Sequence, residues 1–360
     1  MKLSLPRLGF GSQTLFGLDI GSSSVKLVEL SRKGRGGFEL SHLGIAPVAN
    51  EAIVQGAFLN SGAIVDAIRD AVEKAKTRTK NVAAAVSGHS VIVKKVSLPQ
   101  MTRSELEEQI RWEAEQYIPF DVNEVNLDFQ ILDAERGEGQ MDVLLVAAKK
   151  DLIDDYVQVI GEAGLNPVAI DVAAFAVENA FEANYEVSHS ETVALVNIGA
   201  QVVNINVIAN GAPSFTRDIT AAGNQYTEEI QKALSIGFDE AERIKIGGRR
   251  GELSHDVVPK EVEEAMRQVN ESVIGEISRS LDFYGATTAE GRIGRVFLSG
   301  GSSKVAGFRN AFQERTGHRI EMMNPLARMV PNSRFDPDEL QDLAPSLGVA
   351  VGLAMRRMDA

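Results

Sequence analysis

Short runs of alternating hydrophobic and polar residues fill much of the chain, and stretches with helical spacing separate them. Residues 16–30 read FGLDIGSSSVKLVEL, in which two apolar runs flank a polar tip, and this pattern predicts a β-hairpin. Residues 192–219 predict a second hairpin, whose core LVNIGAQVVNINVI parallels LDIGSSSVKLVEL. The parallel is a weak internal repeat, and it indicates two halves of one architecture.

A small β–α–β–β–α unit is predicted over residues 89–164. Its first helix begins with Thr102 followed three residues later by Glu105, which is a capping box. Its second helix ends at Gly164, a residue type typical of a helix C-cap. Within this unit we expect strands at 91–99, 125–132 and 141–150 and helices at 101–117 and 151–164.

Helical spacing marks other segments as well. Residues 61–79 predict a helix with Ser61 in the N-cap position. Residues 343–357, LAPSLGVAVGLAMRR, predict a final helix whose small residues allow close backbone packing, so we expect it to be buried between two lobes. Further strands are expected at 38–45 and 81–88, and a strand followed by a helix is expected after 166. Further helices are expected at 224–247, ending in a Gly-Gly turn, and at 260–290. The segment RVFLSGGSSKVAGF at 295–308 predicts a strand, a Gly-Gly turn and a helix.

Composition excludes several classes of protein. The 360 residues include no cysteine, which excludes disulfides, zinc–thiolate sites and cysteine catalysis and fits a reducing cytoplasm. The formal charge of −13 with dispersed basic residues makes nucleic acid a poor candidate partner. No stretch has the roughly 18 uncharged apolar residues of a membrane span, and the start of the chain lacks a signal-peptide pattern. The five histidines lie far apart, no G-x-x-x-x-G-K-[ST] motif occurs, and the G-x-G at 9–11 precedes the first strand instead of following one.

The tip of the first hairpin has two interpretations. Its glycine and serines suit an ordinary solvated turn. The same residue types also suit an anion site, because successive backbone N–H groups and serine hydroxyls converge on phosphate in glycine-rich nests. In that case Lys26 neutralises the phosphate, and Asp19 holds Mg²⁺ through a water molecule.

Three segments together carry a resemblance to a known superfamily. LDIGSSSVKLVEL, LVNIGAQVVNINVI and VFLSGGSSKVAGF resemble, in the expected order, the two phosphate loops and the adenosine loop of the actin/Hsp70/sugar-kinase superfamily. The small-residue helices after Ile170 and Ala344 resemble its interdomain connectors, and the unit at 89–164 resembles the 1C subdomain of FtsA-like proteins. Within the superfamily, FGLDIGSSSVKLVEL, VKKVSLPQMTRSELEEQIRWEAEQYIPFDV and DVLLVAAKKDLIDDY are similar to the PilM family of type IV pilus assembly proteins.

The resemblance implies an α/β, actin-like (ribonuclease H-like) bilobed fold with an FtsA-type 1C subdomain. The implied subdomains are 1A (1–88 with 165–191 and 343–360), 1C (89–164), 2A (192–222 with 268–342) and 2B (223–267).

The resemblance also implies that ATP and Mg²⁺ bind between the lobes. The residues it assigns to phosphate are Gly21, Ser22, Ser23, Ser24 and Lys26 on the first hairpin and Gly199, Ala200 and Gln201 on the second. Gly300 and Gly301 leave room for the adenine and α-phosphate, and Glu242 and Lys245 face the ribose and adenine. For Gly300 and Gly301 the alternative is a plain strand-to-helix turn, and for Glu242 and Lys245 it is a solvated salt bridge.

Two positions depart from the hydrolysing relatives. The second phosphate loop begins with Asn197 where those relatives have Asp, so it brings no negative charge to the metal-bound water. The connector position that carries Gln or Glu in those relatives matches Asp171 here, which suits water positioning, a helix N-cap, or both. With Asp19, these are the three candidate catalytic residues, and we expect ATP binding with weak or negligible hydrolysis.

The implied role is a cytoplasmic scaffold at the inner membrane that binds the N-terminal peptide of PilN, and through PilN connects to PilO. The pilus motor ATPases and a second copy of the chain are further implied partners, and the membrane is reached only through partners. The peptide groove would be bordered by 89–120 and 141–150, where Trp112, Tyr117, Ile118 and Phe120 are either contacts or 1C core. The chain ends at MRRMDA without the membrane helix of FtsA. The alternatives are a small-molecule kinase and a filament-forming FtsA-like protein.

Overall fold

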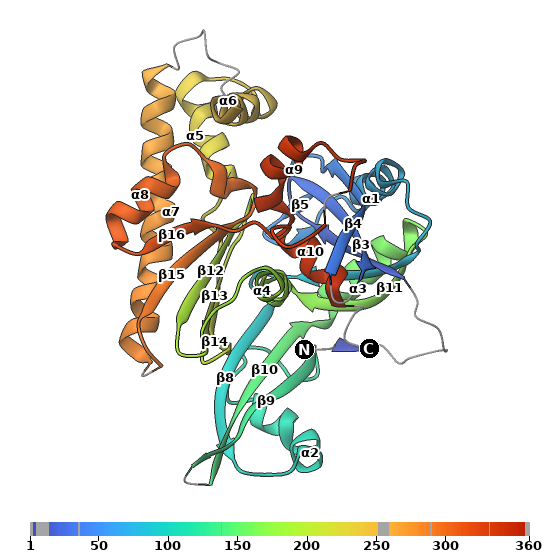
Figure 1. Cartoon of the computed structure of the whole chain (residues 1–360), viewed down its shortest axis with the longest axis vertical. Coiled ribbons are helices and arrows are strands. Elements are labelled where there is room, and N and C mark those ends of the chain that lie inside the picture. The colour runs from blue at the N-terminus through green and yellow to red at the C-terminus, as the bar shows by residue number, and fades with distance from the viewer. Residues whose placement is uncertain are drawn as a thin grey trace.

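The structure is a computed structural model that describes residues 3–4, 14–34, 37–137, 139–250, 259–288, 290–330 and 332–356. It contains two large sheets with helices, and a smaller sheet that projects from one of them (Figure 1). The G-x-G at 9–11 and the MDA end of the final segment lie outside the described residues.

The first lobe is built on a six-stranded sheet in the order β1-β11-β7-β2-β3-β4. The hairpin predicted at 16–30 is confirmed, because β2 and β3 pair antiparallel, whereas β2, β7 and β11 run parallel. Helices α1 (Ser61–Ala75) and α3 (Lys150–Glu162) bury their apolar faces in the core of this sheet. The strands are β1 (Leu3–Ser4), β2 (Leu15–Ile20), β3 (Ser24–Lys33), β4 (Gly37–Pro47), β7 (Asn81–Val86) and β11 (Asn166–Val172), and the short pair β5 (Ile53–Val54) and β6 (Ala57–Phe58) follows β4.

The second lobe is built on a five-stranded sheet in the order β14-β13-β12-β15-β16. Its strands are β12 (Thr192–Ile198), β13 (Val203–Ala209), β14 (Ala212–Ile219), β15 (Ile293–Ser299) and β16 (Arg319–Met322), and the predicted hairpin is the antiparallel pair β12 and β13. The long helix α7 (Lys260–Thr287) and helix α8 (Phe308–Thr316) pack on this sheet. Helices α5 (Asn224–Leu234) and α6 (Phe238–Arg250) lie beyond it and pack on each other and on α7.

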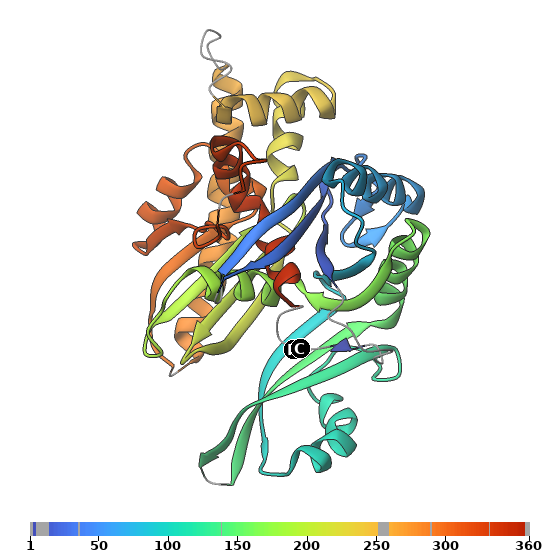
Figure 2. The same cartoon turned by 45° about the vertical axis from the view of Figure 1, so that its right-hand side comes forward.

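Two helices of small residues lie between the sheets (Figures 1 and 2). Helix α4 (Ala173–Asn184) and helix α10 (Gly348–Met355) share a core with apolar side chains from both sheets, as predicted for the final helix. A Cβ at Gly352 would lie 1.6 Å from the Ala176 carbonyl oxygen, and a Cβ at Gly17 would lie 2.0 Å from the Ala350 carbonyl oxygen. Glycine therefore permits the close contacts among α10, α4 and β2. The short elements α9 (Pro337–Leu343) and η2 (Ala344–Leu347) precede α10.

The small unit, residues 91–149, is a three-stranded sheet in the order β8-β10-β9 with helix α2. It extends away from the first lobe and lies beside β14 of the second lobe (Figure 2). Its elements are β8 (Val91–Pro99), α2 (Arg103–Ala114), β9 (Val125–Gly137) and β10 (Gln140–Lys149). The predicted capping box is confirmed, because Thr102 and Glu105 each bond to the other's backbone N–H.

Several local predictions need correction. Helix α3 was predicted within the 89–164 unit, but its buried side chains pack against α1 in the core of the first sheet. Helix α1 is capped by Asn60, whose side chain accepts from the Ala63 N–H, and not by Ser61. The helix predicted at 224–247 is interrupted at Ser235, which has a left-handed backbone, so α5 and α6 are separate helices.

Candidate functional site

The first loop (19–26) places a carboxylate opposite an ammonium group. Asp19 and Lys26 face each other across β2 and β3, with the Lys26 Nζ 3.1 Å from the Asp19 Oδ2. Both side chains are largely buried, with 20% of Asp19 and 14% of Lys26 exposed. The Gly21 N–H donates to the Ser24 carbonyl oxygen at 3.1 Å, which closes the turn tightly. The serines of this turn therefore lie directly beyond a paired acid and base.

The second loop (197–202) and the third loop (299–303) are tied together at the ends of neighbouring strands. The Gly199 carbonyl oxygen accepts from the Ser302 hydroxyl at 2.8 Å and from the Gly223 N–H at 3.1 Å. The Ala200 carbonyl oxygen accepts from the Asn224 N–H at 2.7 Å. These hydrogen bonds fix the second loop, the third loop and the beginning of α5 next to one another.

Gly300 is required by its surroundings. Its φ is +87°, and a Cβ there would lie 2.2 Å from the Ile198 carbonyl oxygen. Its N–H donates to the Pro345 carbonyl oxygen at 2.6 Å, so the turn is also held from the η2 side. Gly301 begins the short helix η1 (Gly301–Lys304), and open space surrounds its Cβ position.

One segment of the first lobe contacts both hairpin loops. The Val48 N–H donates to the Ser23 carbonyl oxygen at 3.0 Å. Farther along the same segment, the Gln201 side chain donates to the Ile53 carbonyl oxygen at 2.7 Å and accepts from the Gln55 N–H at 3.0 Å. The Gln201 side chain thus both donates to and accepts from the backbone of the first lobe. Together with the Val48–Ser23 bond, these contacts bring the first and second loops to residues 48–55.

Glu242 and Lys245 form a pair that is packed against α5. Their side chains are 2.6 Å apart, and only 10% of the Lys245 side chain is exposed. Lys245 also donates to the Thr227 hydroxyl at 2.9 Å and to the Gly223 carbonyl oxygen at 3.2 Å. Because Gly223 contacts the second loop, this pair is attached to the site through the beginning of α5, which argues against a purely solvated salt bridge.

Asn197 is the first member of a hydrogen-bonded chain. Its side-chain oxygen accepts from the Ser299 hydroxyl at 3.2 Å, and its amide donates to the Asn204 side-chain oxygen at 3.0 Å. Asn204 in turn donates to the Asp218 Oδ1 at 2.8 Å, and the Gly88 N–H donates to the Asp218 Oδ2 at 2.5 Å. Burial raises the pKa of the Asp218 carboxyl, although these two hydrogen bonds act in the opposite direction.

Asp171 is committed to a buried ion pair. Its carboxylate binds the Arg356 guanidinium, and only 2% of its side chain is exposed. Helix α4 is capped by Val172 with no side-chain capping bond, so the N-cap interpretation of Asp171 is wrong. Water positioning by Asp171 stays a prediction, and it would have to occur from a carboxylate whose charge Arg356 already neutralises.

Glu178, a residue that sequence reasoning did not select, is buried on α4 between the lobes. It accepts from the Asn206 side-chain amide at 2.7 Å. Burial raises the pKa of its carboxyl to about 8, and the charges of Glu182 and Asp171 act in the same direction. The sequence pattern does not predict that Glu178 is buried, because the charged and amide residues of ENAFEAN are typical of an exposed helix face.

The candidate aromatic and apolar contacts of the small unit divide into two groups. Ile118 is 7% exposed and lies in the core of that unit, with Tyr117 and Phe120 partly buried against the same core. The core interpretation therefore holds for Ile118. Trp112, on α2, is 65% exposed, so its indole is accessible to a partner.

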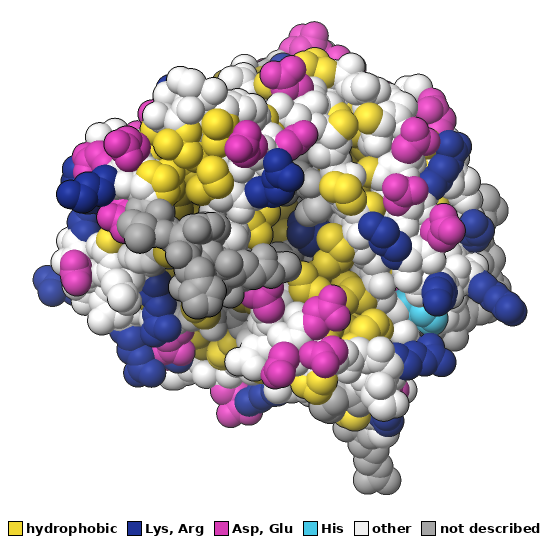
Figure 3. All heavy atoms as spheres, turned by 90° about the horizontal axis from the view of Figure 1, so that it is seen from above, with side chains coloured by type: hydrophobic (Ala, Val, Ile, Leu, Met, Phe, Trp, Pro, Cys, Tyr) yellow, Lys and Arg dark blue, Asp and Glu magenta, His cyan; other side chains and the backbone are white. Residues whose placement is uncertain are grey.

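The space-filling view from above shows a central hollow with a basic side chain inside it and apolar side chains around it (Figure 3). A cavity of about 560 Å³ adjoins the third loop, between η1, the end of β16 and η2. Within the described ranges, no cluster of three or more His, Asp or Glu is placed to hold a metal ion directly. In the same part of the chain, no helix has the length and apolarity needed to cross a bilayer.

Comparison with known proteins decides the family. A family model described as "Type IV pilus assembly protein PilM" matches residues 17–358. The chain belongs to the PilM family. A solved PilM-PilN type IV pilus biogenesis complex contains a chain that is 30% identical to this PilM family member, with a TM-score of 0.86 over 97% of this chain and 100% of that one.

Two more distant proteins are also similar to this PilM family member, one in sequence and one in structure. The cell division protein FtsA of Neisseria meningitidis serogroup B (strain MC58) is 25% identical over 305 residues, which are 76% of this chain and 72% of FtsA. The MreB5 protein of Spiroplasma citri, solved with ADP bound, is 12% identical with a TM-score of 0.51 over 97% of this chain and 99% of that one. The predicted actin-like α/β fold is thereby confirmed.

Proposed function

We propose that this chain is an actin-like, ATP-binding scaffold of the type IV pilus inner-membrane assembly complex that binds the N-terminal cytoplasmic peptide of PilN. The observation that carries the proposal is the arrangement of three loops in a PilM family member: the first and second loops converge on residues 48–55, and the second and third loops are hydrogen-bonded together. The family match favours this role over a small-molecule kinase or a filament former.

The residues of the site suit a nucleotide with Mg²⁺. Glycine turns at the loop tips let backbone N–H groups approach phosphate closely, and the serines of the first loop add hydroxyl donors. Lys26 offers an ammonium group to phosphate, and Asp19 is a single carboxylate of the kind that holds hydrated Mg²⁺. The metal would neutralise phosphate charge, and the present pairing of Asp19 with Lys26 keeps both groups in place at the loop.

The same geometry argues for slow hydrolysis. Both polar atoms of the Asn197 side chain already have partners, and the amide carries no charge with which to stabilise a metal-bound water. Asp171 is occupied by Arg356. General-base catalysis needs a basic group within hydrogen-bonding reach of the attacking water; the Asn197 amide is not basic, and the Asp171 carboxylate is already paired. The nucleotide therefore acts mainly as a bound ligand.

The small unit is the proposed site of the partner peptide. The PilM-PilN complex contains the PilN partner of that relative, and we carry this partner over to the present chain. Trp112 is an exposed aromatic side chain on α2, and aromatic residues frequently anchor interfaces. Binding to PilN would attach the chain to the inner membrane. The further partners of the proposed assembly are PilO, the motor ATPases and a second copy of the chain.

Calorimetric titration of a Mg-ATP analogue tests the nucleotide part of the proposal. We expect Asp19→Ala to weaken binding at least tenfold, which is about 1.4 kcal/mol. Asp66→Ala is a matched control, because that carboxylate is 77% exposed on α1 and pairs with its helix neighbour Arg69 at 3.5 Å. Equal affinities for the wild type and Asp19→Ala would contradict the site.

Titration of a synthetic PilN N-terminal peptide tests the partner. Trp112→Ala should weaken binding of the peptide, because the indole is proposed as an interface anchor. Leu59→Ala is the control, because Leu59 is 66% exposed in the loop before α1, away from the small unit. Failure of the wild type to bind the peptide would remove PilN from the proposal without affecting the nucleotide site.

A further inference from the structure

Strand β14 is connected to the small unit in two ways, through Gly88 just before β8 and through Glu290, which binds Lys95 of β8. It forms the edge of the second sheet and runs beside β8 (Figure 1). Asp218 lies near one end of β14, next to the second loop, and Ser214 lies near the other end. Through its full pairing with β13, which follows the second loop directly, β14 must move with that loop.

The first contact lies where the chain enters the small unit. Asp218 accepts from the Gly88 N–H at 2.5 Å and, through Asn204, is connected to Asn197. Gly88 has a φ of +90° and lies in the connection from β7 to β8. A single half-buried carboxylate therefore joins the second loop to the segment through which the chain enters the small unit.

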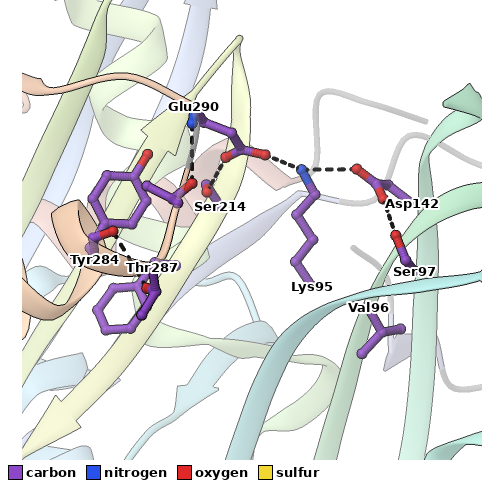
Figure 4. Close-up of a pocket in the computed structure, with 10 residues that line it drawn as sticks. Lys95, Val96, Ser97, Asp142, Ser214, Tyr284, Thr287 and Glu290 are labelled. Carbon is purple, nitrogen blue, oxygen red and sulfur yellow. Dashed lines mark hydrogen bonds and ion pairs between the residues drawn. The ribbon is translucent and has the colours of Figure 1, made fainter.

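The second contact lies farther along β8 (Figure 4). Lys95 lies between Asp142 of its own sheet, at 3.0 Å, and Glu290 of the second lobe. Glu290 also accepts from the Ser214 hydroxyl of β14. Burial lowers the pKa of Lys95, but its hydrogen bonds and charge interactions with Glu290 and Asp142 raise it overall, so the ion pairs persist at neutral pH.

The joint around Lys95 is polar and incompletely packed. A pocket of about 220 Å³ separates β8 from the end of α7. The Tyr284 hydroxyl is buried beside it without a hydrogen-bond partner among the described residues. Lys95 and Glu290 are each 23% exposed, so a largely buried charge pair makes the contact at the edge of this pocket. Such a pair can transmit a displacement of Glu290 to Lys95, and the pocket leaves room for the movement.

We propose that β14 couples the nucleotide site to the small unit, with Asp218 and the Lys95–Glu290 pair as its two attachment points. This inference rests on the proposed function, since the ligand that displaces the second loop is the nucleotide. A ligand that reorients Asn197 shifts Asn204 and Asp218, and with them Gly88. The Lys95–Glu290 pair makes β8 follow the second lobe, so the peptide-binding surface changes position.

Distance measurement by pulsed electron paramagnetic resonance tests this link, because the chain has no cysteine of its own. Spin labels at Glu108→Cys on α2 and Asp66→Cys on α1 report the position of the small unit relative to the first lobe, and both positions are exposed. In the wild-type background we expect a Mg-ATP analogue to shift the mean distance. No shift, with nucleotide binding shown by calorimetry, would overturn the proposal.

Two isosteric variants locate the link. Asp218→Asn keeps one acceptor oxygen and loses one of the two hydrogen bonds, and Glu290→Gln removes the charge that pairs with Lys95. We expect each to reduce the nucleotide-induced shift at least twofold while nucleotide affinity changes less than threefold. Glu263→Gln, an exposed position on α7, is the matched control and should keep the full shift. A full shift in both test variants would refute the role of β14.

The width of the distance distribution in the nucleotide-free protein tests the two attachment points independently of nucleotide binding. The two test variants should broaden the distance distribution relative to the wild type and to Glu263→Gln, because each loosens one attachment of the small unit. Unchanged widths would show that these contacts do not hold the small unit, whatever the nucleotide does. If the wild type binds no nucleotide, the proposed function fails, and the widths still decide whether β14 holds the small unit.

Discussion

Replacing Glu178 by Gln should make the protein more stable at alkaline pH. The carboxyl of Glu178 is 7% exposed on α4, and burial raises its pKa from the ordinary 4.5 to about 8. In the folded protein the group therefore keeps its proton up to about pH 8, whereas in the unfolded chain it ionises near pH 4.5. Between these values the unfolded state binds fewer protons, so stability falls as pH rises.

The magnitude follows from the size of the shift. A change of one pKa unit corresponds to about 1.4 kcal/mol, so a rise from 4.5 to about 8 gives an upper limit of about 5 kcal/mol. Relaxation around the charged group reduces this figure, and we expect a loss of about 2–5 kcal/mol between pH 4.5 and pH 8. Glutamine retains an oxygen for the Asn206 amide, which now donates to Glu178 at 2.7 Å, but glutamine does not titrate.

Denaturant unfolding at half-unit steps from pH 4.5 to pH 9 measures the effect. The variant should match the wild type near pH 5, exceed it progressively up to pH 8, and stay ahead by a constant amount above that. Glu73→Gln, at an exposed position on α1, controls for the loss of one negative charge. A difference between wild type and Glu178→Gln that does not vary with pH would refute the reasoning, because a buried titrating group requires that dependence.

Three further outcomes are expected. Gly352→Ala should destabilise the protein by about 1–3 kcal/mol or prevent folding, because its Cβ would lie 1.6 Å from the Ala176 carbonyl oxygen, whereas Gly161→Ala, with open space on α3, should be neutral or stabilising by thermal unfolding. Gln201→Ala should increase amide hydrogen exchange at Gln55, whose N–H it binds, while leaving exchange at Ala63, bound by Asn60, unchanged. Asn197→Asp should raise the rate of phosphate release from ATP, and a slower rate would contradict the view that missing charge limits turnover.

The two hairpins could be predicted because each is a local pattern. Alternating apolar residues around a Gly-containing tip specify β2 with β3 and β12 with β13, and their pairing confirms both. The burial of α10 could be predicted as well, because a run of small and apolar residues without charges has no polar face to expose to water. Such features depend on neighbours in sequence, and a single sequence contains all of the information they need.

Contacts between distant segments could not be predicted in the same way. Asp218 stands in SFTRDI, where a carboxylate near the end of a strand is expected to face solvent, and the sequence does not show that Gly88 and Asn204 donate hydrogen bonds to it. The pairing of Asp171 with Arg356 likewise joins residues 185 positions apart. The placement of α3 was missed for a related reason, because its periodic pattern shows that one face is buried but not which sheet buries it.

The place where the small unit joins the first lobe also bears on how proteins of this shape arise. Strands β7 and β11 are adjacent and parallel, and α3 packs on their sheet, so they would form an ordinary strand–helix–strand crossover without residues 91–149. The Lys149 N–H donates to the Ser90 carbonyl oxygen at 3.0 Å, so the chain leaves and returns at one point. An insertion with adjoining ends can be accepted by a host fold without displacing the strands of the host. The unit could therefore have entered an existing crossover, after which side chains such as Leu144 and Val146 packed against Phe175 of the host.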